Sequence, residues 1–139
     1  MSKVSILPLG EWIFYLGENH NNLDQSKCGK WMYFFNDVSS AAEMCEKAIV
    51  NDICVESKHS NAPEGVCCFY LNGDDIQAHK RVINYFVENN LIRRTKIGKL
   101  YNISFKYDNQ TRAGMYGDEF IGEIKLEQFL NLNTGEWLV

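Results

Sequence analysis

The six residues 66–71 constrain the fold of this chain more than any other stretch. Their sequence, VCCFYL, is apolar on both faces of an extended strand, and the turn-forming residues Asn72 and Gly73 follow it directly. A short apolar run bounded by turn signals is typical of a strand that is covered on both faces. We therefore predict that residues 66–71 form an interior strand of a sheet.

Residues 101–107 predict a second kind of strand, with one face buried and one face polar. Tyr101, Ile103, Phe105 and Tyr107 alternate strictly with Asn102, Ser104 and Lys106, which is the period of two expected for a half-buried strand. The strand belongs to a predicted hairpin over residues 91–117, in which Gly98 is the turn between two arms.

The other elements follow from periodicity and turn residues. We expect strands at 4–9, 11–16, 30–35 and 53–58, helices at 39–50 and 75–89, and a short third helix at 123–132. Ser40 and Glu43 resemble a capping box at the start of the first helix. This order predicts one α+β domain over 1–139: a mostly antiparallel sheet with two or three helices on one face. The other face would carry Lys58, Asn102, Ser104 and Lys106 as the working surface.

Positive charge gathers in one part of an acidic chain. The net charge is −4 and the pI is near 5.3, yet no acidic residue lies between Leu91 and Lys106, where five basic residues occur: Arg93, Arg94, Lys96, Lys99 and Lys106. An acidic pI argues against a general nucleic-acid binder, whereas a local basic patch suits a small anionic ligand or a defined partner. No signal peptide or membrane span is expected, so we expect a cytoplasmic protein with no membrane partner.

Known catalytic and metal-binding motifs are missing from the sequence. The five cysteines have no C-x-x-C spacing and are expected to be buried, reduced thiols, so we expect no zinc site, disulfide or other cofactor. His79 lies on the apolar stripe of a predicted helix and is expected to be a core residue. His59 lies at a strand end, where either solvent or a ligand would reach it. Trp12, Trp31, Tyr33, Tyr101 and Tyr116 are core aromatics or, alternatively, a stacking site.

Several short segments resemble a known family. GKW (29–31), ESKHS (56–60), VCCFYLNGDD (66–75) and FKYDNQTRAGMY (105–116) resemble, in this order, the basophilic-leukaemia-expressed protein family, whose bacterial relatives are labelled phosphothreonine-lyase-domain proteins. The resemblance implies a fold similar to the cap-binding translation initiation factors, a curved antiparallel sheet backed by helices. It maps a strand-end lysine onto Lys58, where the surrounding residues depart from the family pattern. It maps a K-x-D…T…G-x-Y signature onto Lys106, Asp108, Thr111, Gly114 and Tyr116.

Charge, position and resemblance together predict one pocket for a phosphate-bearing small molecule or nucleotide. Its expected residues are Lys58, Arg93, Lys106, Thr111, Arg112 and Tyr116; the alternative is a solvated hairpin whose lysines prevent aggregation. A second hypothesis is an enzyme that eliminates phosphate from a phosphothreonine-like substrate, with Lys58 or Lys106, His59 and Arg93 or Arg94 as base, acid and phosphate ligands. A third is a small acidic inhibitor or adaptor, for example a viral one, that binds a protein partner. The sequence does not decide whether the chain is an enzyme, and it leaves the oligomeric state open.

Overall fold

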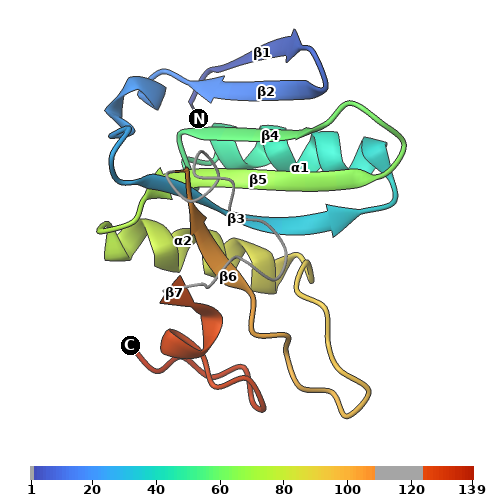
Figure 1. The fold of residues 1–139 in the computed structure, drawn as a ribbon, viewed down its shortest axis with the longest axis vertical. Coiled ribbons are helices and arrows are strands. Elements are labelled where there is room, and N and C mark those ends of the chain that lie inside the picture. Colours follow the sequence, from blue (N-terminus) through green and yellow to red (C-terminus); the bar gives the residue numbers. More distant parts are fainter. Residues whose placement is uncertain (1, 109–123) are drawn as a thin grey trace.

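The computed structural model describes residues 2–108 and 124–139 of the chain. Its strands are β1 (Val4–Leu9), β2 (Trp12–Gly17), β3 (Cys28–Phe35), β4 (Glu56–Ser60), β5 (Gly65–Asn72), β6 (Ser104–Tyr107) and β7 (Ile124–Lys125). In the described residues they form one curved, unclosed seven-stranded sheet in the order β1-β2-β4-β5-β3-β6-β7, with antiparallel neighbours (Figure 1). The predicted α+β class with an antiparallel sheet is confirmed.

The predicted interior strand is also confirmed. β5 lies between β4 and β3, and its neighbours cover both of its edges. Cys68 is only 2% exposed although it points away from the helices, so both faces of β5 are covered, as the VCCFYL run indicates.

Two α-helices in the described residues, α1 (Val38–Val50) and α2 (Ile76–Glu88), pack on the same face of the sheet (Figure 1). Ser57 on β4 donates from Oγ to the Cys45 carbonyl of α1 at 2.8 Å. Trp31 on β3 donates from Nε1 to His79 Nδ1 of α2 at 3.0 Å. Ser57 and Trp31 both lie opposite Phe69 in the strand register, so the two contacts are made from one face.

The helix starts are fixed by aspartate side chains. Asp37 caps α1, because its Oδ1 accepts from the backbone N–H groups of Ser39 and Ser40 at 3.0 and 3.4 Å. The predicted capping box of Ser40 and Glu43 is therefore wrong, and the helix begins at Val38 rather than at residue 39. Asp75 caps α2 in the same way by accepting from Ala78.

The predicted third helix is wrong in the described residues. Residues 124–125 form β7, which pairs with β6, and only a short 3-10 turn, Leu126–Gln128, follows. Ile124 lies opposite Phe105, and the Leu126 N–H donates to the Ile103 carbonyl at 2.9 Å. Pairing at the sheet edge therefore prevails over the helical spacing of apolar residues in this segment.

The predicted hairpin is shorter than expected. Gly98, with φ +86°, forms the turn as predicted, but the described arms form no regular strand ladder: they pair through an isolated bridge between Arg94 and Leu100. Regular strand begins at Ser104, because the Tyr101 N–H donates to Arg93 and the Leu100 N–H donates to Leu132 instead of to a sheet neighbour. The predicted polar loop after Asp108 lies outside the described residues.

No helix among the described residues is long and apolar enough to cross a lipid bilayer.

Candidate anion-binding site

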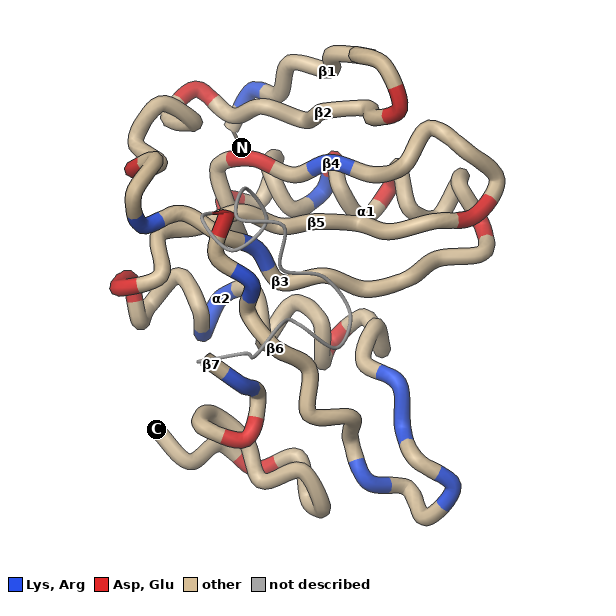
Figure 2. Tube along the Cα trace, viewed as in Figure 1, with Lys and Arg blue, Asp and Glu red and all other residues tan. Residues whose placement is uncertain are grey.

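Three lysines lie on the face of the sheet opposite the helices, which is called here the lysine face: Lys30 on β3, Lys58 on β4 and Lys106 on β6. Strand register brings them together, because Glu56, Tyr70, Lys30 and Lys106 lie opposite one another across β4, β5, β3 and β6. Lys58 follows Glu56 by two residues and therefore points to the same face. In Figure 2 basic positions, drawn in blue, lie on β4, β3 and β6.

Lys58 lies among aromatic rings. Its ammonium is 3.9 Å from the Trp12 ring centroid, 5.4 Å from that of Phe14 and 5.7 Å from that of Tyr70, all within the range of a cation–π contact. Desolvation lowers the pKa of the Lys58 amine below its ordinary value, while Cys68 opposes this shift and Lys30 adds to it. The site therefore holds a partly desolvated cation beside flat apolar groups.

Lys30 is buried and paired with a carboxylate. Its Nζ lies 2.8 Å from Asp108 Oδ1, and it lies 5.8 Å from the Tyr70 ring centroid. The other oxygen of Asp108 accepts from the Cys28 thiol at 3.5 Å. Because buried lysines are rare unless paired, the contact with Asp108 helps to stabilise Lys30 at this position.

Lys106 lies directly opposite Lys30 across the β3–β6 pair and is only 8% exposed. Desolvation lowers the pKa of the Lys106 amine, and Lys30 lowers it further. Side chains opposite one another in an antiparallel pair have Cβ atoms about 4.5–5.5 Å apart, and like charges there are destabilising. The register thus places two lysines opposite one another in the middle of the lysine face.

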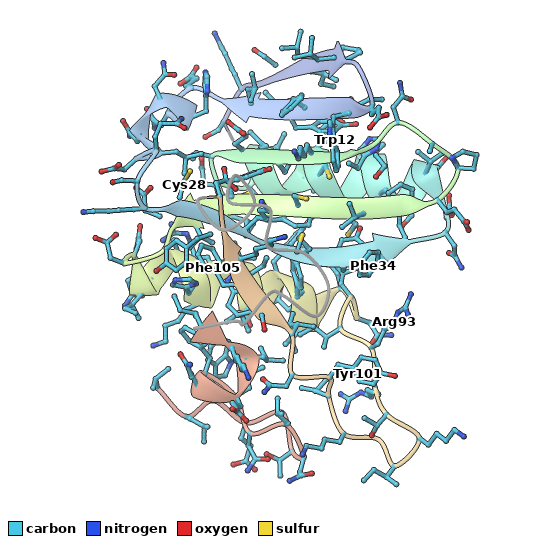
Figure 3. All side chains as sticks on the ribbon, in the orientation of Figure 1. Trp12, Cys28, Phe34, Arg93, Tyr101 and Phe105 are labelled. Atoms are coloured by element: carbon cyan, nitrogen blue, oxygen red, sulfur yellow. The ribbon has the colours of Figure 1, made fainter. Side chains whose placement is uncertain are left out.

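Arg93 does not lie with these lysines. It lines a cavity of about 410 Å³ together with Phe34, Asn36, Asp37 and Asn90, and a neighbouring cavity of about 820 Å³ also includes Phe34 and Arg93. In Figure 3 Arg93 lies near Phe34 on the right, whereas Cys28, which contacts Asp108, lies on the left. The structure therefore places Lys58 and Lys106 of the predicted pocket on the same face of the sheet, whereas Arg93 lines a different cavity.

The other predicted site residues, Thr111, Arg112 and Tyr116, lie outside the described residues. So does Gly114 of the family-like signature. Of the two predicted polar neighbours of Lys106, Asn102 lies outside β6 and Ser104 lies within it. Asn102 precedes β6 and accepts from the Glu127 N–H at 3.0 Å, while Ser104 begins the strand.

His59 is a core residue, so the expectation that solvent or a ligand reaches it is wrong. It is 1% exposed. Its Nδ1 donates to the Ser60 carbonyl at 2.9 Å, and its Nε2 accepts from the Tyr15 hydroxyl at 3.0 Å. Alternation along β4 explains the position, because His59 points to the helix side whereas its neighbour Lys58 points to the lysine face.

His79 is a core residue, as predicted. Its Nδ1 accepts from Trp31, and its Nε2 donates to the Gly73 carbonyl at 2.8 Å. These two contacts require the neutral tautomer with the proton on Nε2, and burial lowers the pKa of the imidazole. The five cysteines are buried free thiols, which confirms their predicted burial.

Sequence reasoning missed Lys30, Tyr70 and Glu56 as site residues. A signal for Lys30 was present, since alternation in KWMYFF separates Lys30, Met32 and Phe34 from the core residues Trp31, Tyr33 and Phe35. No local signal places Tyr70 beside Lys30, because that contact depends on the register of β3 against β5.

No protein-family model matches the chain, and no curated protein matches its sequence. The candidate site is therefore assigned from its geometry alone.

Proposed function

We propose that the lysine face binds a small phosphate-bearing molecule. The observation that carries this proposal is that Lys30 and Lys58 lie 5.8 and 5.7 Å from the Tyr70 ring centroid, while Lys106 lies opposite Lys30 on the same face of the sheet. The chemistry fits, because lysine ammonium groups are point charges with three donors each and bind phosphate well.

The electrostatics favour an anionic ligand. Desolvation, with added repulsion by Lys30, lowers the pKa values of the Lys58 and Lys106 amines, which means that their charged forms are disfavoured in the ligand-free protein. A bound phosphate would favour the charged forms, and this electrostatic attraction would contribute to the binding free energy. Each charge-assisted hydrogen bond is expected to contribute about 1.5–3 kcal/mol.

The aromatic groups suit a ligand with a flat part, such as a nucleotide. Trp12 and Phe14 on β2 lie beside the Lys58 ammonium and are half-buried. Stacking of a base on an aromatic side chain contributes about 1–3 kcal/mol. A nucleotide ligand is also in keeping with the resemblance to the basophilic-leukaemia-expressed protein family and the cap-binding fold, to which we propose that this sheet belongs.

Phosphate elimination is the less favoured hypothesis. It needs a general acid and phosphate-binding cations close to the catalytic base, but His59 points into the core and both of its ring nitrogens are already hydrogen-bonded. Arg93 lines a separate cavity. Among the described residues, no arrangement favours the protein-adaptor hypothesis over ligand binding.

Isothermal titration calorimetry with inorganic phosphate and with AMP tests the proposal. Lys58→Met and Lys106→Met should each weaken binding by roughly tenfold to a hundredfold, since about 1.4 kcal/mol corresponds to a factor of ten. The matched control is Lys96→Met, because Lys96 is an exposed lysine of the loop before β6 and should bind as wild type does. Absence of phosphate and AMP binding to the wild-type protein, or equal losses in all three variants, would overturn the proposal.

A further inference from the structure

A small polar cavity, called here the polar pocket, lies at one end of the lysine face. Its volume is about 320 Å³. It is enclosed by the first residues of β3 and β4, the end of β5 and the segment around the 3-10 turn His20–Asn22. Its polar and aromatic lining consists of His20, Asn21, Gln25, Glu56, Tyr70 and Asp108.

Two residues that line the polar pocket also lie next to lysines of the lysine face. Tyr70 lines the pocket, and its ring centroid is 5.8 Å from Lys30 Nζ and 5.7 Å from Lys58 Nζ. Asp108 also lines the pocket, and its Oδ1 is 2.8 Å from Lys30 Nζ. A phosphate bound beside Lys30 and Lys58 would therefore lie next to the polar pocket.

The charges in the polar pocket determine how such a ligand is oriented. Glu56 and Asp108 repel a phosphate, so the phosphate remains on the lysine side of Tyr70. The remainder of the ligand then meets carboxylate oxygens and the side chains of Asn21 and Gln25. Carboxylates accept hydrogen bonds and amides both donate and accept, so together they match the donors and acceptors of hydroxyl groups.

A neutral group fits the polar pocket better than a second cation does. Asp108 already pairs with Lys30, and Glu56 Oε1 lies 3.9 Å from His20 Nδ1. Both carboxylates therefore have a basic neighbour, while their remaining lone pairs can accept from hydroxyl groups.

We propose that the ligand of the lysine face is a phosphorylated polyhydroxyl compound, a sugar phosphate, whose hydroxyl groups donate to Glu56 and Asp108 in the polar pocket. This inference rests on the proposed function and narrows it to a class of ligand. It assigns Glu56, which sequence reasoning did not single out, as the residue that selects for the sugar.

Calorimetric titrations with inorganic phosphate, ribose 5-phosphate and ethanolamine phosphate test the inference. Ribose 5-phosphate should bind at least tenfold more tightly than inorganic phosphate, because each hydrogen bond to a charged acceptor is expected to contribute roughly a factor of ten or more. Glu56→Gln should reduce this advantage about tenfold and leave the affinity for inorganic phosphate unchanged. Asn21→Ala, on the exposed side of the pocket, is a second variant that also reduces the advantage, and Glu64→Gln, which lines a different cavity, is the matched control.

The outcomes separate the inference from the proposed function. If inorganic phosphate does not bind to the wild-type protein, the proposed function fails and the inference fails with it. If inorganic phosphate binds but ribose 5-phosphate binds no more tightly, or if Glu56→Gln and Asn21→Ala both retain the full advantage, only the inference is overturned. Tighter binding of ethanolamine phosphate than of ribose 5-phosphate also overturns it, because the polar pocket would then select a cation.

Discussion

Phe105→Ala should remove a large part of the stability of this fold. The Phe105 side chain is fully buried, and its ring centroid lies 4.8 Å from that of His79, 5.9 Å from that of Trp31 and 5.2 Å from that of Tyr107. Truncation of a core phenylalanine to alanine costs about 3–5 kcal/mol, and the cost rises with the volume of the cavity that remains.

The surroundings of Phe105 indicate a loss in the upper half of that range. Trp31 and His79 are held in place by their mutual hydrogen bond and by the bond from His79 to Gly73, so they cannot easily move into the cavity. Gly29, directly beside the ring, has no side chain that would fill it, since a Cβ atom there would be 2.7 Å from the Phe105 ring. We therefore expect a loss of about 4–5 kcal/mol in the free energy of unfolding.

Urea unfolding followed by tryptophan fluorescence measures this loss. Phe105→Leu is the matched control, because leucine refills part of the cavity and should lose less than half as much stability. Both variants should retain the wild-type dependence of the free energy on urea concentration if they unfold in two states. A loss below about 1 kcal/mol for Phe105→Ala, typical of a surface substitution or weaker core contact, would refute the position of Phe105 between β3 and α2.

Four further predictions concern the close approach of β3 and β6, the buried His79, Arg93 and the thiols. Gly29→Ala should lower the free energy of unfolding by about 1–3 kcal/mol, because its Cβ would lie 2.5 Å from the Lys106 carbonyl oxygen; unchanged stability would contradict the close approach of β3 and β6. Burial lowers the pKa of His79 in the folded protein, so below the unfolded-state pKa of about 6.5 the unfolded chain takes up this proton more readily than the folded protein. The free energy of unfolding should therefore fall as the pH falls below about 6.5, by up to ~1.4 kcal/mol per pH unit. His79→Gln should flatten that slope, and an unchanged slope would assign it to other groups. Arg93→Ala should leave the dissociation constant for phosphate within about twofold of wild type, whereas a tenfold loss would place Arg93 at the lysine face. All five thiols should react with a thiol reagent only after unfolding, because all five are buried; burial also raises the pKa of Cys54 and of Cys68 to about 12. A stable disulfide in protein prepared without reductant would contradict this.

Periodicity was sufficient for the elements whose contacts are determined by local sequence. The VCCFYL run predicts the interior strand β5, and the apolar stripe around His79 predicts both α2 and the buried imidazole. Such patterns succeed because a strand or helix repeats its buried face at a fixed spacing. The third predicted helix failed because Ile124 pairs with Phe105 across the sheet edge, which is a contact between segments that are distant in sequence.

The candidate site depends mainly on register, which no local pattern reveals. Lys58 and Lys106 could be assigned to one face from alternation, but Lys30 joins them only because β3 pairs with both β5 and β6. Asp108 reaches Lys30 across the same β3–β6 pair. Arg93 is close to Lys106 in sequence, yet the short hairpin directs it to a different cavity. A shift of one residue in any of these pairings would move a lysine to the opposite face.

The most direct test of anion binding at the lysine face is the pKa of the Lys58 and Lys106 amines, measured by NMR with and without phosphate. In the free protein both pKa values should lie below the ordinary value of 10.5, because desolvation lowers them. Phosphate at saturating concentration should raise both pKa values, since a nearby negative charge favours the ammonium form, while the side-chain resonances of the exposed Lys96 should not move. Unchanged pKa values for Lys58 and Lys106 at phosphate concentrations that saturate the calorimetric signal would contradict binding at this face.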